Sequence, residues 1–134
     1  MNSQCFVTSI HKEWDIVAAR QMGRELAKKI GFGTVDQARI TTAISELARN
    51  IYLYASKGQI KFEVIESLEQ KGIKVVAEDS GPGIEDLSQV MEDGFSTSGG
   101  LGAGLPGVRR LMDEFDIISE IGKGTIINTI KWVR

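Results

Sequence analysis

A glycine-rich stretch from Asp79 to Gly107 constrains this chain more than any other feature. Its 29 residues hold eight of the 15 glycines in the sequence. Glycine destabilises the interior of helices and strands, and it gathers where the backbone turns sharply or comes close to a ligand. The stretch therefore predicts a binding loop within a folded domain, although a flexible surface loop could have the same composition.

The upstream end of this stretch predicts a pocket for a base. Ile73, Val75 and Ala77 alternate with the residues between them, which is typical of a half-buried strand. Asp79 falls in phase with this apolar set, so its carboxylate should point toward the interior. A buried carboxylate is costly unless a hydrogen-bond donor meets it. The exocyclic amine of adenine is such a donor.

The downstream end predicts a cradle for phosphates. Gly104 and Pro106 mark the start of a helix whose apolar residues are Leu105, Val108, Leu111, Met112 and Phe115. A glycine-rich loop that leads into a helix N-terminus offers free N–H groups to an anion. A Walker-type loop does not fit, because Leu105 stands where that motif needs lysine. A dinucleotide fingerprint does not fit either, because these glycines do not follow a first strand.

Composition indicates one soluble globular domain over residues 1–134. The chain is 42% hydrophobic and 25% charged, and its net charge of −2 argues against nucleic acid as the main partner. Cys5 is the only cysteine, which excludes a disulfide framework and cysteine zinc sites. The sequence shows neither a membrane-spanning run nor a signal-peptide pattern, so we expect a cytoplasmic protein with no membrane partner.

The order of predicted elements indicates an α+β fold. We expect a strand at 5–10, helices at 14–30 and 35–56, a strand around Ile60 to Val64 and its hairpin mate at 73–79 after a turn at 69–72. Beyond the glycine-rich stretch and its helix, strands at 116–121 and 125–133 form another hairpin. The arrangement predicts a two-layer sandwich, with a mixed, mostly antiparallel sheet and helices on one face.

The first long helix should bury one stripe and expose a basic face. The stripe comprises Trp14, Val17, Ala18, Met22, Leu26 and Ile30, and Gly31 ends the helix. The opposite face carries Arg20, Arg24, Lys28 and Lys29. Such a face is commonly solvated; it could also dock an acidic partner.

The second long helix carries the candidate catalytic pair. A capping box of Thr34 and Gln37 should start it, and its buried stripe comprises Ile40, Ala43, Ile44, Leu47, Ile51, Tyr54 and Ala55. Glu46 and Asn50, four residues apart, lie at the border of that stripe. Asn50 offers a neutral oxygen for Mg²⁺, and Glu46 could deprotonate a nucleophile. An ordinary polar flank would have the same spacing. Arg49 should project to the far side, where it is solvated or faces a partner.

Four motifs in a fixed order resemble a known superfamily. They are Glu46 with Asn50 on a helix, 79–83 after a strand, 100–105 before a helix and 122–125 in a hairpin. Together they resemble the ATP-binding fold shared by gyrase, Hsp90, histidine kinases and MutL, the GHKL or Bergerat fold. Within it, residues 41–50 and 95–105 are similar to the switch kinases of bacterial partner-switching systems, specifically those of the stressosome. A phosphoacceptor helix is missing and the lid at 93–99 is short, which disfavours a histidine kinase.

The resemblance implies a mechanism. Asp79 holds the adenine amine, Thr125 lies near the base, Asn50 binds Mg²⁺, and Glu46 acts as base toward a serine or threonine hydroxyl. The remaining ATP-binding positions that the resemblance implies are Gly81, Gly83, Gly100, Leu101, Gly102, Ala103, Gly104 and Leu105.

The resemblance also implies partners. The hydroxyl belongs to STAS-domain scaffold or antagonist proteins, and the released kinase activates a downstream phosphatase or other output protein. Arg20 and Arg24 are the candidate docking residues. Two alternatives stay open: an anti-sigma factor with kinase activity, and a nucleotide-binding module without catalysis.

Overall fold

The computed structural model describes residues 4–84, 87, 91 and 104–134 of the chain. The elements are β1 (Cys5–Ile10), α1 (Trp14–Ile30), α2 (Thr34–Tyr54), β2 (Gly58–Glu66), β3 (Lys71–Asp79), α4 (Gly104–Leu111), β4 (Glu114–Glu120) and β5 (Gly124–Trp132). Their order is the predicted one. Within the described residues, no helix is long and apolar enough to span a membrane.

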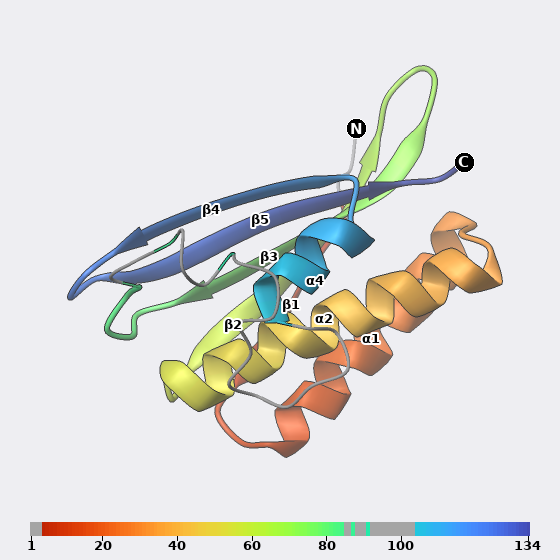
Figure 1. The fold of residues 1–134 in the computed structure, drawn as a ribbon. Helices are drawn as coiled ribbons and strands as arrows, with labels where there is room; N and C mark the ends of the chain where they lie inside the picture. Colours follow the sequence, from red (N-terminus) through yellow and green to blue (C-terminus); the bar gives the residue numbers. More distant parts are fainter. Residues whose placement is uncertain (1–3, 85–86, 88–90, 92–103) are drawn as a thin grey trace.

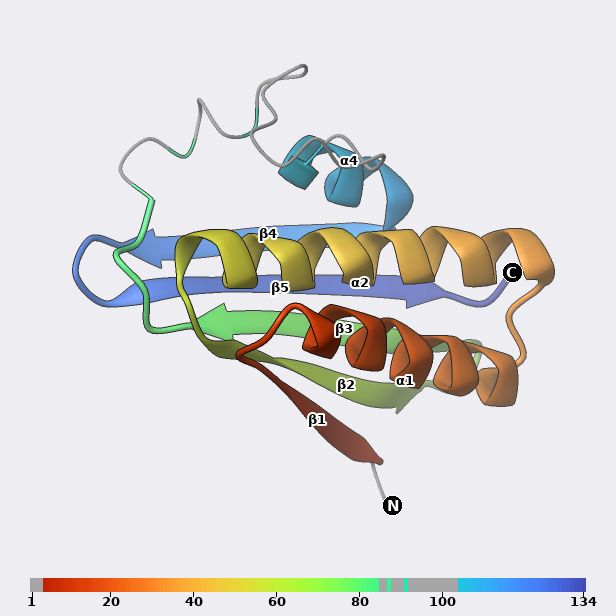
Figure 2. The same cartoon turned by 90° about the horizontal axis from the view of Figure 1, so that it is seen from below.

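The five strands form one sheet in the order β1-β2-β3-β5-β4. Each described pair is antiparallel, so the expectation of a mixed sheet is wrong in that detail. Among the described elements, α1, α2 and α4 cover one face of the sheet (Figures 1 and 2). The predicted α+β two-layer sandwich is confirmed. The strands need no parallel crossover, because β3 and β5 run antiparallel although α4 and β4 separate them along the chain.

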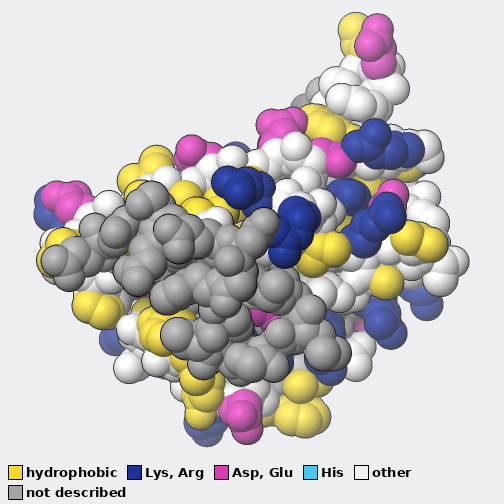
Figure 3. All heavy atoms as spheres, in the orientation of Figure 1, with side chains coloured by type: hydrophobic (Ala, Val, Ile, Leu, Met, Phe, Trp, Pro, Cys, Tyr) yellow, Lys and Arg dark blue, Asp and Glu magenta, His cyan; other side chains and the backbone are white. Residues whose placement is uncertain are grey.

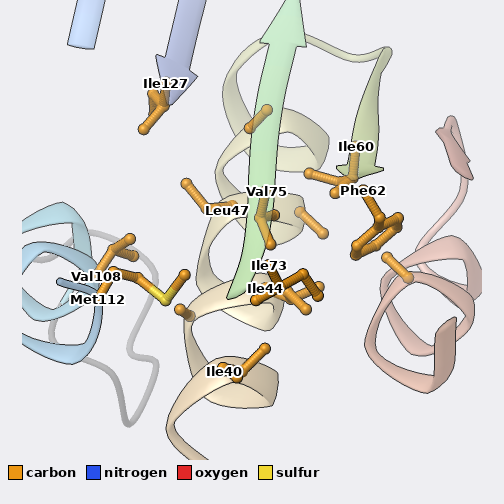
Figure 4. Close-up of a cluster of buried hydrophobic side chains, with 14 of the residues drawn as sticks. Ile40, Ile44, Leu47, Ile60, Phe62, Ile73, Val75, Val108, Met112 and Ile127 are labelled. Atoms are coloured by element: carbon orange, nitrogen blue, oxygen red, sulfur yellow. The ribbon is translucent and has the colours of Figure 1, made fainter. Parts of the chain in front are cut away.

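The core lies between α2 and the middle of the sheet. α2 contributes Ile40, Ile44, Leu47 and Ile51, each at most 1% exposed. They meet side chains from β2, β3, β5 and α4, among them Phe62, Val75, Ile127 and Val108 (Figure 4). Burying such side chains contributes roughly 1.5–3 kcal/mol each relative to leaving them in water. This packing fixes α2, and with it the candidate catalytic pair, over the sheet.

The buried stripe of α1 differs from the prediction. Trp14 is 73% exposed, and the contact with the core is made by Ile16, Ala19, Gly23, Leu26, Ala27 and Ile30. A Cβ atom on Gly23 would lie 2.1 Å from Cδ1 of Ile44. α1 therefore approaches α2 through small residues, which a search for large apolar side chains does not detect.

Four local predictions at element ends are also wrong. Gly33, not Thr34, is the N-cap of α2, without a side-chain capping bond, and the side chain of Gln37 donates to the Phe32 carbonyl instead. Tyr54 is 47% exposed. Phe115 lies in β4, because α4 ends at Leu111. The β2–β3 turn also falls earlier than predicted, with β3 already under way at residue 71.

Candidate active site

Asp79 ends β3 in the predicted orientation, on the face that the helices cover. In the sheet register it lies opposite Gly58 on β2 and Thr125 on β5. Its Oδ1 accepts a hydrogen bond of 2.9 Å from the Gly81 N–H, and the Thr125 N–H also donates to the carboxylate. Burial raises the pKa of Asp79 and outweighs the two backbone hydrogen bonds, which lower it. The carboxylate can accept further hydrogen bonds, for example from an amine.

The loop after Asp79 packs tightly against α2 and the β4–β5 hairpin. A Cβ atom on Gly81 would lie 2.7 Å from Cβ of Ala55, just beyond the end of α2. Gly83 has a φ of +82°, and a Cβ there would lie 2.5 Å from the Glu120 carbonyl oxygen. Both predicted positions therefore serve close backbone approach, which brings the end of α2 next to Asp79.

Thr125 is buried beside Asp79 and belongs to a small hydroxyl network. Its Oγ1 lies 2.8 Å from Oγ of Ser119 on the neighbouring strand. Ser119 Oγ in turn accepts a 2.8 Å hydrogen bond from the Ile84 N–H. Ser119 was not predicted, although alternation along the β4–β5 hairpin places it opposite Thr125. It ties the loop after Asp79 to β4.

Glu46 and Asn50 lie on α2, one turn apart, in different environments. Glu46 is only 5% exposed, so the expectation of a border position holds for Asn50 and not for Glu46. The Asn50 side chain is half-buried and makes no hydrogen bond within the described residues. Its amide oxygen can thus take a cation. The described residues contain no cluster of three acidic, histidine or cysteine side chains that could hold a metal without a ligand's help.

A groove of about 490 Å³ between α1 and α2 brings Glu46 together with the predicted docking residues. Its described lining comprises Arg20, Gln21, Arg24, Ala38, Thr41, Thr42, Ser45, Glu46 and Arg49. Arg20 and Arg24 are exposed. Lysine and arginine side chains are spread over this helical side of the molecule (Figure 3). The candidate base therefore lies in a groove whose described lining is rich in arginine.

The prediction that Arg49 projects to the far side of α2 is wrong. Arg49 lines the groove, where its Nη1 lies 3.0 Å from Oε1 of Glu46. The i,i+3 spacing of the two residues was the available signal, since such pairs meet on a helix surface.

The predicted phosphate-binding end of the glycine-rich stretch is described only from Gly104 onward. Gly100, Leu101, Gly102 and Ala103, and the predicted lid at 93–99, lie outside the described residues. Gly104 opens α4 with a φ of +69°, and Leu105 is a buried residue in the first turn of that helix. The predicted helix start is thus confirmed, and α4 packs beside α2.

Comparison with known proteins agrees with this geometry. The family described as histidine kinase-, DNA gyrase B- and HSP90-like ATPases matches residues 35–133, which include Glu46, Asn50, Asp79 and Thr125. The chain belongs to this family of ATPases. Use of ATP follows from membership.

Relatives within the family indicate which kind of protein the chain is. Over its whole length the chain is 69% identical to the full length of the serine/threonine-protein kinase RsbT of Bacillus subtilis strain 168. It is 33% identical over 101 residues to an anti-sigma F factor of Caldanaerobacter subterraneus subsp. tengcongensis, covering 72% of this chain and 70% of that protein. The predicted enzyme class, a serine/threonine-protein kinase, is confirmed.

Solved structures support the fold. A Mycobacterium tuberculosis protein with RsbU and RsbW domains aligns with 98% of this chain and 32% of its own, with a TM-score of 0.65 and 19% identity. The mycobacterial sensor histidine kinase MprB aligns with 99% of both chains, with a TM-score of 0.55 and 14% identity. At these identities the likeness concerns the fold of the family.

Proposed function

We propose that this family member is an ATP- and Mg²⁺-dependent cytoplasmic kinase that phosphorylates STAS-domain scaffold or antagonist proteins of a stressosome. Once released from them, it binds and activates a downstream phosphatase or other output protein. The observation that carries the proposal is the groove between α1 and α2, where Glu46 lies beside two exposed arginines. A folded partner seated there would bring its hydroxyl to the candidate base.

Asp79 and Asn50 bind the nucleotide in this proposal. Asp79 accepts a hydrogen bond from the adenine amine, with Thr125 beside the base. Gly81 and Gly83 belong to the base end of the glycine-rich stretch, and Gly100, Gly102 and Gly104 wrap the phosphates with their backbone. Asn50 fits a Mg²⁺ ligand because its oxygen is half-buried and without a hydrogen bond in the described structure. Bound Mg²⁺ supplies charge neutralisation at the phosphates.

Glu46 is the proposed base for the transfer step. It accepts the proton of the serine or threonine hydroxyl as that oxygen bonds to the γ-phosphorus and the bond to the ADP oxygen breaks. Its position in the groove shields it from bulk water, with 5% of the residue exposed. Phosphoryl transfer depends mainly on positioning, so seating of the hydroxyl against Glu46 determines which proteins are substrates.

Charge reversal on α1 tests this docking. Arg20→Glu and Arg24→Glu should slow phosphorylation of an intact STAS domain at least about tenfold, because like charges then face each other across the interface. ATP affinity should not change. Lys28→Glu and Lys29→Glu are matched controls, since both lysines are exposed on the same helix and neither lines the groove.

A short peptide that spans the acceptor hydroxyl provides the second arm. It carries the hydroxyl without the folded surface, and its phosphorylation should be slow in each variant. Equal phosphorylation of the peptide and the intact domain would contradict docking in the groove.

The runner-up is an anti-sigma factor with kinase activity. The match to anti-sigma F factors favours it, since it covers 72% of this chain. Pull-down with purified sigma factor in parallel with a STAS-domain protein separates the two. Retention of the sigma factor alone would favour the runner-up.

A further inference from the structure

The ion pair between Arg49 and Glu46 connects the docking groove to the candidate base. The two residues are three apart on α2, and the 3.0 Å contact joins Arg49 Nη1 to Oε1 of Glu46. The side chain of Glu46 is 4% exposed, whereas that of Arg49 is 33% exposed. One end of the pair is therefore fixed in the protein, and the other reaches the groove where a partner would sit.

The groove has a surplus of positive charge in its described lining. Arg20, Arg24 and Arg49 face it with three guanidinium groups, and Glu46 supplies the one carboxylate. Within the described residues, neither Arg20 nor Arg24 forms an ion pair. Such a lining favours an acidic side chain, because guanidinium binds carboxylate through parallel hydrogen bonds.

An acidic side chain in the groove would compete with Glu46 for Arg49. Arginine has five donors and a long stem, so a guanidinium that is partly exposed, as that of Arg49 is, can turn toward a second carboxylate. Nη1 occupies one side of the Glu46 Oε1 atom, so a substrate hydroxyl that approaches this oxygen meets the guanidinium beside it. Withdrawal of Arg49 would therefore present this oxygen to the docked hydroxyl.

From this geometry, and on the basis of the proposed function, we infer that Arg49 is a positioning residue that restrains Glu46 until a partner docks. The partner is a folded protein that carries an aspartate or glutamate beside its acceptor hydroxyl. Its carboxylate draws Arg49 away, and Glu46 then receives the proton. The partner's fold brings this carboxylate beside the hydroxyl, and neither water nor a short peptide presents it there, so the restrained enzyme transfers phosphate to them slowly.

Arg49→Met tests the inference by a gain of activity. The variant keeps side-chain length and removes the restraint. Release of inorganic phosphate from ATP without any partner should rise about tenfold, as expected for losing one charge-assisted hydrogen bond. Transfer to the intact STAS domain should fall, because the groove has lost an arginine. Adding Glu46→Gln to Arg49→Met should abolish the rise, which a purely structural role of Arg49 would not predict.

Arg39→Met is the matched control. Arg39 forms an i,i+3 pair with Asp36 at 2.9 Å on the same helix and does not line the groove. Its loss should leave partner-free phosphate release at the wild-type rate.

The outcomes separate the inference from the function on which it rests. If the wild type does not phosphorylate a STAS domain, the proposed function fails. If the wild type does so and Arg49→Met leaves partner-free release unchanged or lower, the inference is overturned and the function stands. Should Arg49→Met fail to bind ATP, Arg49→Gln decides by the same criterion, since glutamine removes the positive charge and keeps a polar side chain.

Discussion

At the scale of single residues, Asp79 is a carboxylate whose hydrogen bonds do not compensate for its burial. Two backbone N–H groups, from Gly81 and Thr125, bind it, yet burial still raises its pKa. The surroundings of Asp79 therefore disfavour its negative charge, which a hydrogen bond from a ligand amine would stabilise. Its orientation could be predicted, because side chains alternate strictly along a strand and Asp79 is in phase with Ala77.

Asp79→Asn should reduce ATP affinity and leave the fold intact. Asparagine keeps one oxygen for the Gly81 N–H but can place an N–H donor against the adenine amine. An unpaired buried polar group costs about 1–3 kcal/mol, or roughly a five- to 150-fold loss of affinity. Titration calorimetry with ATP measures it. Unchanged affinity would remove Asp79 from the base pocket.

The same substitution has a signature in the pH dependence of stability. Because the pKa of Asp79 is raised in the folded state, the stability that it contributes is present below its ordinary unfolded pKa and is lost as pH rises through the folded value. Without nucleotide, Asp79→Asn should therefore gain stability relative to the wild type as the pH rises through that window. Urea unfolding of both proteins at acidic and neutral pH gives the difference. A constant difference would contradict the raised pKa.

Asn50→Ala should increase the Mg²⁺ concentration needed for half-maximal transfer. It removes the proposed protein oxygen, and the described part of the chain offers no acidic cluster to replace it. Asn128→Ala is a suitable control, since Asn128 is also half-buried but lies on the sheet face away from the helices. Identical Mg²⁺ dependence of Asn50→Ala and the wild type would exclude Asn50 as a ligand.

Arg49 illustrates what the sequence could not supply at this scale. A long side chain on a helix flank can extend in several directions, and its choice depends on neighbours. Here the neighbours are Glu46 on its own helix and a groove that α1 completes. The direction of the Arg49 side chain could be predicted only with the packing of α1 against α2 already known.

At the scale of elements, the strands and helices were predictable wherever periodicity was strong. β1 and α1 have the predicted bounds because apolar residues repeat regularly there. The buried face of α1 differs from the predicted one, because the small residues Ala19 and Gly23 make its contacts with the core. The start of α2 was misread because a capping-box sequence does not act as one when Gly33 takes the N-cap.

Gly124→Ala in the β4–β5 hairpin should weaken both the fold and ATP binding. Gly124 has a φ of +127°, and a Cβ there would lie 2.0 Å from the carbonyl oxygen of Asp79. Left-handed backbone costs roughly 1–2 kcal/mol and overpacking a further 1–3. The strain falls on Asp79, so ATP affinity should drop as well.

Gly122→Ala isolates the close approach. Gly122 lies in the same hairpin with a φ of +82°, and a Cβ there would meet nothing within 4 Å. Its unfolding free energy should fall by about 1–2 kcal/mol, from the backbone alone. If Gly122→Ala and Gly124→Ala lose equal amounts of stability and of ATP affinity, the close contact between Gly124 and Asp79 has no effect on the site.

At the scale of the whole molecule, Lys131 joins the elements on which the site depends. The side chain is 7% exposed; its Nζ donates to the Leu111 carbonyl at the end of α4 and lies 3.6 Å from Asp113 and 3.9 Å from Asp36 in the first turn of α2. Burial raises the pKa of Asp113. Hydrogen bonds from the Trp132 N–H and Arg134, together with the charge of Lys131, lower this pKa by more than burial raises it, so the net shift is downward. The network fixes α4 relative to α2.

Lys131→Met should lower the unfolding free energy by about 1–3 kcal/mol, because the Leu111 carbonyl loses its donor in a partly buried place. The loss should be larger near neutral pH than in strong acid. Asp113 contributes stability above its ordinary pKa and loses it as pH falls through the lowered folded value, so its attraction to Lys131 counts only while it is charged. Urea unfolding across this range is the measurement, and an equal loss at both ends would exclude the ion pair as its cause.

The central claim is that one end of the molecule binds ATP through Asp79 while Glu46 performs the transfer. The most direct test measures ATP affinity and phosphate transfer to an intact STAS domain side by side, in Asp79→Asn and in Glu46→Gln. General-base help is worth about 10²–10⁴ in rate. The account predicts that Glu46→Gln binds ATP with Mg²⁺ nearly as the wild type does and transfers phosphate slower by that factor, whereas Asp79→Asn loses affinity first. If Glu46→Gln instead loses affinity and transfer in equal measure, Glu46 is a structural residue and the account is wrong.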